Sequence, residues 1–554
     1  MLPSHRPRLA VLLAGISWLA LAGSGTLEAW QTPASPQPAL TQRLQLLLRT
    51  RFPASGQPPE LAAPDGSTFR AAPALPCFYG RRGFAPAWVA DTGLRPEADD
   101  LLAAVADAAG DGLLPEDYGL TALRQRIAQA RSRSLPGVPG DLAELDLQLT
   151  DAFLRLAADL HNGRVNPELI YSDCELDIPD LDASTVLESA LAAGKVRQAL
   201  ADLAPAQAGY RSLKQALARY REIAARGGWP AVPAGPTLKP GEKGERVAAL
   251  RARLEASAEL AMAAPGAPGD PAAVDRDFFD PSLQAAVRTF QERNGLDADG
   301  AVGPGTLEAL NVTAAERVRQ IEINLDRWRW LPRDLGERYV MVNIAGFALD
   351  VVEAGKPALS MRVVAGKPTN RTPMFSGTMT HLVLNPYWNV PSGILKKEVL
   401  PHIARDPGYL ARQNMEMLPG GKVRQRPGAN NALGKIKFLF PNRFDVYLHD
   451  TPSRSLFSRS VRTFSHGCIR VEKPLELAEY LLKDDPAWTP EKIQKALAKG
   501  SESWVKIPNP LPVHLAYWTA WVDDAGVTQF RKDVYGRDKP LAEKLEAVQG
   551  PAAP

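Results

Sequence analysis

The spacing of apolar residues divides the chain into a helical N-terminal part and a strand-rich C-terminal part. Between residues 40 and 226, apolar positions recur every three or four residues, the spacing of one helix face. The clearest run is Leu142, Leu145, Leu149, Phe153, Leu156 and Leu160. Asn162 and Gly163 follow that run and predict that its helix ends there. Shorter runs cover 101–109 and 187–203, so we expect a helical scaffold domain over residues 38–226.

A Pro/Gly-rich break over residues 226–236 precedes a smaller helical unit, which we place at residues 238–312. Its apolar spacing predicts helices over 247–260 and 281–291. Glycines mark its tight turns, and we expect three of its apolar residues to pack in a small core. These residues are Val287, Phe290 and Leu307.

A linking segment, residues 313–335, contains one more predicted helix, and the pattern then changes. Short β-branched and aromatic runs, separated by Gly, Pro and Asn, predict strands. The runs are 339–344, 348–352, 361–364, 381–384, 435–440 and 444–449. Residues 391–430 between them read as helix and loop. We therefore expect a multidomain α+β protein whose β-rich domain, residues 336–540, carries an insertion at about 391–430 that could act as a lid.

Composition bounds the kind of protein and its location. The chain has 554 residues, 45% hydrophobic and 23% charged, which is typical of globular domains. Its net charge of +3 gives no reason to expect a nucleic-acid partner. His5, Arg6 and Arg8 precede the apolar run Leu9 to Ala22, so residues 1–29 read as a signal peptide or an N-terminal anchor. Either reading predicts export, with membrane contact only through that anchor.

The chain has three cysteines. In an oxidising compartment Cys77 and Cys174 could pair, or both could remain free thiols. Cys468 would then be the unpaired cysteine, and it lies in the motif richest in reactive side chains.

That motif is Ser465 to Arg470, with the sequence SHGCIR, and it follows His449 at the end of a predicted strand. A thiol nucleophile needs an imidazole to take its proton. His449 is our candidate base. His466 is a rival, because residues two apart in an extended segment share a face. Gly467 leaves the backbone beside Cys468 open to a substrate oxyanion.

Two other readings of these residues are possible. A buried cysteine is often a packing residue. His449, His466 and Cys468, with Asp450, could also bind zinc, but structural zinc sites usually carry paired Cys/His knuckles. We therefore expect no metal. Arg470 would be more than a surface charge if the site binds carboxylates, which arginine grips with two hydrogen bonds.

The span from His449 to Arg470 resembles the signature of YkuD-type L,D-transpeptidases. Further matches are 385–391 (NPYWNVP), 364–367 (VAGK) with Thr372-Pro373, 431–435 (NALGK) and 440–442 (FPN). Residues 286–307 likewise resemble a small three-helix peptidoglycan-binding module. With its helical scaffold, the chain is similar to the large YcbB-type members of Gram-negative periplasms over nearly everything after residue 40.

The resemblance implies a cofactor-free acyl transfer between peptidoglycan stem peptides in the periplasm. Cys468 would attack the third residue of a donor tetrapeptide, diaminopimelate, and release the terminal D-alanine. The diaminopimelate amine of an acceptor stem would resolve the thioester into a 3→3 cross-link. His449 would move the protons, and other cell-wall synthases are candidate partners.

The resemblance also implies roles for neighbouring residues. Gly467 and Cys468 amides, with the Tyr447 hydroxyl, would stabilise the oxyanion, while Ser465 and His466 would orient the site. The residues expected to contact substrate are Arg470, Trp388 and Asn389.

Two functional alternatives stay open at this point. Water in place of the amine would make the protein an L,D-carboxypeptidase. A chain without activity could serve as a wall-binding scaffold through residues 238–312. The resemblance also implies inhibition by carbapenems through Cys468.

Overall fold

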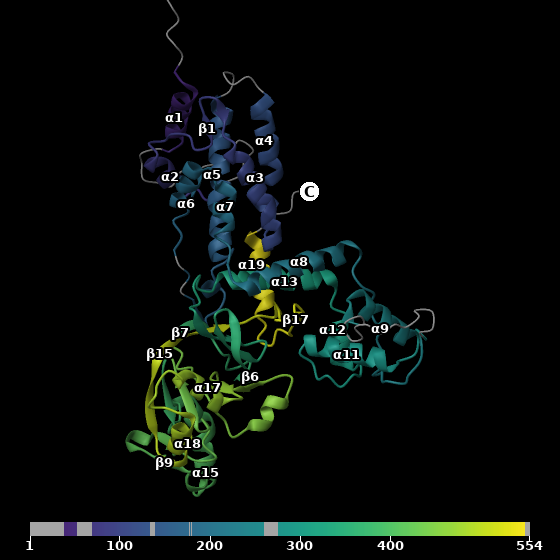
Figure 1. Ribbon diagram of the computed structural model, residues 1–554, viewed down its shortest axis with the longest axis vertical. Coiled ribbons are helices and arrows are strands. Elements are labelled where there is room, and N and C mark those ends of the chain that lie inside the picture. Colours follow the sequence, from purple (N-terminus) through teal and green to yellow (C-terminus); the bar gives the residue numbers. More distant parts are fainter. Residues whose placement is uncertain are drawn as a thin grey trace, which may run out of the picture.

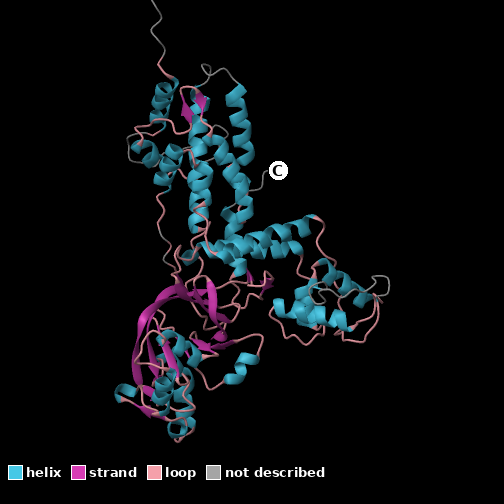
Figure 2. Ribbon diagram, in the orientation of Figure 1, coloured by secondary structure: helices cyan, strands magenta, loops and turns pink. Residues whose placement is uncertain are grey.

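The computed structural model describes residues 38–52, 69–132, 139–176, 178, 180–259 and 275–548. The expected signal or anchor at residues 1–29 lies outside these ranges. Among the described residues, no helix has both the length and the apolar character needed to cross a bilayer. Helices dominate the N-terminal part and strands the C-terminal part, as expected (Figure 2).

The helical domain is built around one long helix, α5. The helices are α1 (Leu40–Arg51), α2 (Leu75–Arg81), α3 (Glu97–Asp107), α4 (Leu120–Ser132), α5 (Pro139–Asn162), α6 (Ala183–Ala193), α7 (Val196–Ala201) and α8 (Ala208–Ala225), with 3-10 turns η1 (Ala108–Asp111), η2 (Pro115–Tyr118) and η3 (Pro167–Leu169). A two-stranded hairpin pairs β1 (Val89–Ala90) with β2 (Gly93–Leu94). All six residues of the predicted apolar face of α5 are buried. The helix predicted over 187–203 is two helices, because Gly194 adopts φ +64° between them.

The smaller unit forms around α9 (Glu245–Ala256), α11 (Pro281–Arg293) and α12 (Pro304–Leu310). Its own apolar cluster contains Val287 and Phe290, and Leu307 packs at the cluster's margin, as predicted. The unit lies to one side of the molecule (Figure 1).

The linking helix α13 (Ala314–Arg329) joins the domains. It begins at a capping box formed by Thr313 and Glu316. It runs alongside α8, between the helical domain and the β-rich domain (Figure 1). Asp326 on α13 accepts hydrogen bonds from the buried guanidinium of Arg164, just after α5. A buried pair of this kind fixes relative orientation, since breaking it would leave an uncompensated charge.

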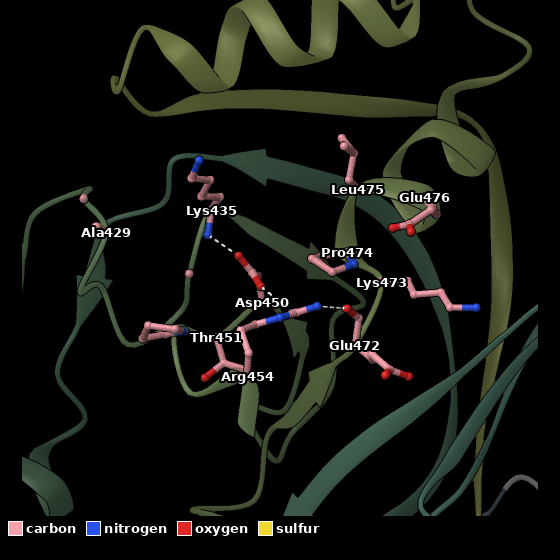
Figure 3. Close-up of a pocket in the computed structure, with 13 residues that line it drawn as sticks. Ala429, Lys435, Asp450, Thr451, Arg454, Glu472, Lys473, Pro474, Leu475 and Glu476 are labelled. Carbon is pink, nitrogen blue, oxygen red and sulfur yellow. Dashed lines mark hydrogen bonds and ion pairs between the residues drawn. The ribbon is translucent and has the colours of Figure 1, made fainter. Parts of the chain in front are cut away.

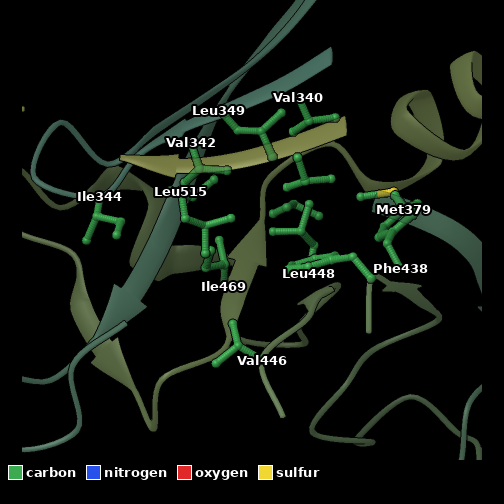
Figure 4. Packing of buried hydrophobic residues seen from close by; sticks show 14 of the residues in the cluster. Val340, Val342, Ile344, Leu349, Met379, Phe438, Val446, Leu448, Ile469 and Leu515 are labelled. Atoms are coloured by element: carbon green, nitrogen blue, oxygen red, sulfur yellow. The ribbon is translucent and has the colours of Figure 1, made fainter. Parts of the chain in front are cut away.

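The C-terminal domain is a sheet that closes on itself. Its strands are β4 (Arg338–Asn343), β5 (Ala348–Glu353), β6 (Lys356–Gly366), β7 (Met374–Leu384), β11 (Ile436–Leu439), β12 (Leu448–His449), β14 (Ile469–Val471) and β15 (Ser503–Ala516). Neighbours along the path are β11, β12, β14, β6, β5, β4, β15 and β7. Because β11 also pairs with β7, the path returns to its start. Apolar side chains from these strands fill the interior (Figure 4).

Further elements surround this sheet. The strand β13 (Thr463–Ser465) pairs with β6, and β16 (Ala520–Val522) pairs with β17 (Thr528–Phe530). The helices α17 (Pro474–Leu482) and α18 (Pro490–Ala498) pack on the core, and α19 (Asp538–Val548) follows. The strand β3 (Cys174–Glu175) comes from the helical domain and pairs in parallel with the start of β7.

The three cysteines are all free thiols. Cys174 is buried in β3, whereas Cys77 lies on α2 in the helical domain. The disulfide considered from the sequence is therefore absent from the structure.

The insertion is a separate small unit. It contains α14 (Ser392–Ile394), the π-helical turn η5 (Leu395–Val399), α15 (Leu400–Arg405), α16 (Tyr409–Arg412) and the 3-10 turn η6 (Pro419–Gly421). A further 3-10 turn, η7 (Arg454–Ser458), comes later in the chain and lies outside the insertion. It also holds a sheet that the prediction of helix and loop missed, ordered β8 (Trp388–Asn389), β10 (Val423–Gln425) and β9 (Met415–Met417). Val390, Val399 and Val423 form its core. These strands are only two or three residues long, which is too short for periodicity to reveal.

Candidate functional site

The SHGCIR motif and His449 meet where two strands run side by side. The parallel strands β12 and β14 pair Leu448 with Ile469 and His449 with Arg470. Cys468 directly precedes β14, as Tyr447 precedes β12, and the Ile469 N–H donates to the Tyr447 carbonyl at 3.1 Å. Alternate residues of a strand share a face. Register alone therefore brings Tyr447, His449, Cys468 and Arg470 to one face.

The opposite face of the same strands is the apolar core, which explains why the register is firmly set. Leu448, Ile469 and Phe438 lie next to one another across three strands and are fully buried. A slip of one residue would put these side chains outside and the polar group inside. The core thus positions the reactive side chains.

His449 is held as a neutral base. It is 5% exposed, and its Nδ1 lies 2.6 Å from the Asp450 carbonyl oxygen. A carbonyl can only accept, so Nδ1 carries the proton and Nε2 keeps its lone pair. Burial, reinforced by the positive charge of Arg470, lowers the His449 pKa to about 3. At neutral pH this imidazole can accept a proton.

Cys468 is partly buried, among hydrogen-bond donors and cations. Burial raises the pKa of its thiol, whereas the Tyr447 amide and hydroxyl, Lys437 and Arg470 act to lower it. The Tyr447 hydroxyl pKa is raised far above its usual value, mainly by burial, so the phenol stays a donor. The resting site therefore holds a neutral thiol and a neutral imidazole on the same face.

Lys437 is a member of this cluster that sequence reasoning missed. It pairs with His449 across β11 and β12, and its Nζ lies 3.8 Å from the centre of the Tyr447 ring. Burial lowers the pKa of its ammonium, while Cys468 acts to raise it. A lysine alternating with the core residues Ile436 and Phe438 is the sequence signal that could have pointed to it.

Ser465 and Gly467 shape the turn before the thiol. The Ser465 hydroxyl donates to the Cys468 carbonyl, and the Gly467 N–H donates to Ser465 Oγ at 3.2 Å. Gly467 has φ +118°, a conformation that favours glycine. Its carbonyl accepts from Thr372 Oγ1 at 2.8 Å. In this arrangement the Gly467 amide, expected as an oxyanion donor, is engaged within the loop.

His466 faces away from this cluster and toward the insertion. Its Nε2 lies 2.7 Å from Glu398 Oε1 on η5. His466 is thus not equivalent to His449: it connects the motif to the insertion, through a glutamate that the sequence did not single out.

Comparison with known families matches three parts of the chain. Residues 337–489 match the YkuD family, described as an L,D-transpeptidase catalytic domain. Residues 73–217 match a scaffold domain, and residues 243–310 match a family described as "Putative peptidoglycan binding domain". The C-terminal domain is a YkuD L,D-transpeptidase catalytic domain.

Relatives with this domain are found among curated proteins and solved structures. A Haemophilus influenzae protein described as "Putative L,D-transpeptidase" is 32% identical over 243 residues, 40% of this chain and 49% of the relative. The chain thus spans about half the length of that curated relative.

Among solved structures, an L,D-transpeptidase from Mycobacterium smegmatis is 19% identical and covers 32% of this chain and 58% of its own, with a TM-score of 0.17. One from Xylanimonas cellulosilytica is 20% identical and covers 51% of this chain and 98% of its own, also with a TM-score of 0.17. At such scores the family assignment rests on the matched families and the curated relative.

Trp388 and Asn389 of the L,D-transpeptidase domain belong to the base of the insertion. Both lie in β8, opposite Gln425 and Arg424 of β10. Trp388 packs against the insertion's apolar cluster, and Asn389 is exposed. Their expected contact with substrate stays a prediction.

The zinc reading receives no support from the geometry. In the described part of the chain, no three His, Cys, Asp or Glu side chains gather in a way that could hold a metal ion. His466 is directed at Glu398, and the Nδ1 of His449 is bonded to a backbone carbonyl.

Asp450, whose backbone carbonyl fixes the His449 tautomer, also lines a cavity of about 600 Å³ (Figure 3). The Asp450 carboxylate accepts from the Lys435 N–H at 2.8 Å and pairs with Arg454 at 3.3 Å. Arg454 also donates to the Glu472 carbonyl. These contacts hold the segment after β12, and through it the imidazole, from the side away from the thiol.

Proposed function

We propose that this protein is a cysteine L,D-transpeptidase that forms 3→3 cross-links between peptidoglycan stem peptides. The observation that carries the proposal is the shared face of Cys468 and His449, with His449 Nε2 available as a base. The matched peptidoglycan-binding family and the transpeptidase domain support the same substrate class. The basic and apolar segment at residues 1–29 supports a periplasmic location.

In the first half-reaction Cys468 Sγ attacks the carbonyl carbon of diaminopimelate, the third residue of a donor tetrapeptide. The thiol proton passes to His449 Nε2 and then to the leaving nitrogen, as the C–N bond to the terminal D-alanine breaks. The Tyr447 hydroxyl is the oxyanion donor that best fits, because it stays protonated and lies beside the thiol.

In the second half-reaction the side-chain amine of another stem attacks the thioester carbon. His449 takes the proton from the amine, and the C–S bond breaks to restore the thiol. Water in place of the amine would give a tripeptide. The insertion, which contacts the motif through Glu398, is placed to limit the entry of water.

The deciding experiment is mass spectrometry of the products formed from purified disaccharide-tetrapeptide. We expect cross-linked dimers and free D-alanine from the wild type and neither from Cys468→Ala. Tripeptide monomers without dimers would instead show a carboxypeptidase. No products from either protein would leave the chain as a wall-binding scaffold.

A carbapenem gives an independent test of the nucleophile. Attack by Cys468 Sγ on the lactam carbonyl would form an S–C bond, break the C–N bond and move the thiol proton to the ring nitrogen. We expect the mass of the intact wild-type protein to rise by one imipenem molecule, and that of Cys468→Ala to stay unchanged.

A further inference from the structure

The face that carries Cys468 and His449 continues across the neighbouring strands. Register places Trp504 of β15 beside Val383 of β7, Val383 beside Lys437 of β11, and Lys437 beside His449 of β12. In the adjoining row, Lys506 of β15 lies beside His381 of β7, and His381 lies beside Leu439 of β11. Both rows alternate with core residues, so their side chains lie on the face of the thiol, where Val383 is buried and Trp504 and Lys506 are exposed.

Trp504, at the far end of this face, is unusually exposed for so large an apolar side chain. Its side chain is 63% accessible, the largest value for any aromatic residue among the exposed large hydrophobics of the described chain. Tryptophan is enriched at interfaces, where one end of its ring system is apolar and the other is wet. His381, next to it, contributes a second ring at a centroid distance of 6.5 Å.

One hydrogen bond orients the indole. Glu502 accepts from Trp504 Nε1 at 3.4 Å and, through its other oxygen, from the Tyr387 N–H at 2.9 Å. Tyr387 directly precedes β8, so the same carboxylate joins the aromatic pair to the base of the insertion. A ring fixed in this way loses little entropy when a ligand packs against it.

The charge of the face complements an acidic ligand. Lys506 is exposed beside His381, Lys437 lies midway, and Arg470 lies beside His449. Peptidoglycan stem peptides carry free carboxylates, which such cations attract. Register places Lys437 between Val383 and His449, in the middle of the row.

The length of the face also fits the substrate. Trp504 and His449 are three strand spacings apart, or about 14 Å at ~4.8 Å per spacing. An extended peptide covers that distance in about four residues at ~3.4 Å each. The sugar to which the stem is attached lies about four residue lengths from the carbonyl of the third stem residue, toward the start of the stem.

We propose that Trp504 and His381 form a subsite for the amino-sugar ring at the base of the donor stem peptide. The flat, C–H-rich face of the sugar packs on the indole, and Lys506 meets a carboxylate of the stem. This inference rests on the proposed function and adds to it a preference for donors that still carry their sugars.

The test measures binding to the Cys468→Ala protein, which cannot turn the ligand over. Isothermal titration calorimetry gives the Kd of disaccharide-tetrapeptide and of the same tetrapeptide without sugars. We expect Trp504→Ala to raise the ratio of the Kd for disaccharide-tetrapeptide to the Kd for the sugar-free tetrapeptide about tenfold. A tenfold change corresponds to ~1.4 kcal/mol. Trp504→Phe, which keeps a smaller ring, should raise it less.

The control is Leu169→Ala, because Leu169 is 83% exposed but lies on η3 in the helical domain. It should leave the ratio unchanged. An unchanged ratio in Trp504→Ala, or no binding of either ligand, would overturn the subsite. The proposed function fails by a different result, the absence of dimers and D-alanine from the wild type, so the two failures are distinguishable.

Discussion

The imidazole of His466 and the carboxylate of Glu398 lie 2.7 Å apart and join the insertion to the loop that ends at Cys468. Both side chains are partly exposed, at 33% and 51%. Exposed pairs contribute about 0–1 kcal/mol to stability. A contact of that strength can open and close repeatedly, which fits the proposal that the insertion admits a peptide and then excludes water.

Removal of this contact should change the partition between transfer and hydrolysis. We expect Glu398→Ala to raise the ratio of tripeptide to dimer several-fold, with little change in melting temperature. Glu398→Gln, which can still hydrogen-bond, should lie between it and the wild type. Glu308→Ala removes a similarly exposed pair with Lys532 in the small domain and serves as the control. An unaltered product ratio in Glu398→Ala would contradict the idea.

The low pKa of His449 predicts an unusual pH profile. Because burial and Arg470 hold that pKa at about 3, the imidazole stays neutral, and able to accept a proton, down to roughly that pH. We expect kcat/KM to show no fall between pH 7 and pH 5. A decline centred near the ordinary imidazole value of ~6.5 would show that His449 is not the buried base described.

The same pKa links stability to pH. Below pH ~6.5 the unfolded chain protonates His449, whereas the folded protein does not until about pH 3. Stability from this residue is therefore complete above pH ~6.5 and falls, by an amount on the order of a few kcal/mol, as the pH drops toward 3. Melting temperatures at pH 7 and 4.5 should differ more for the wild type than for His449→Gln.

Lys437 should lower the pKa of the Cys468 thiol. Its ammonium acts to lower the pKa of Cys468, so Lys437→Met should shift the pH dependence of alkylation by iodoacetamide to higher pH. We expect a shift of about one unit or less, given a charge close to the thiol in a partly screened site. Lys435→Met, two residues away on the cavity side, is the matched control. Identical profiles for all three proteins would remove Lys437 from the site.

A buried ion pair near the loop should matter more for stability. Arg537 is fully buried, pairs with Asp173 at 2.6 Å and donates to the Thr372 carbonyl. Asp173→Ala would leave that cation without its partner, at a cost of about 3 kcal/mol. Glu175→Ala breaks the exposed pair with Arg443 two residues along and should cost less than 1 kcal/mol. Thermal melts of the two variants test the difference.

The parts of the site that the sequence predicts are those that lie close together in the chain. Cys468, Ser465 and Gly467 are neighbours, and His449 ends a strand with a clear apolar pattern. Lys437 and Glu398 reach the site only through strand register and through the packing of the insertion. Neither relation leaves a periodic signal, so sequence reasoning missed both.

The same reason explains the missed elements of the fold. The long apolar face of α5 predicts that helix well, because many turns repeat the pattern. The strands β8, β9 and β10 contain two or three residues each and show no repeat. The pairing of β3 with β7 joins segments that are far apart in sequence, and nothing local indicates it.

That pairing sets a limit on how the protein can be divided into working parts. The family boundaries place Cys174 and Glu175 in the scaffold region and β7 in the L,D-transpeptidase domain, yet one hydrogen-bonded ladder includes both. A fragment cut between them would expose the N–H and C=O groups of Met374 and Phe375 as a free edge. Such an edge recruits strands from other molecules. Expressed alone, the catalytic domain would therefore carry an unpaired edge at this point, and the scaffold supplies the strand that covers it.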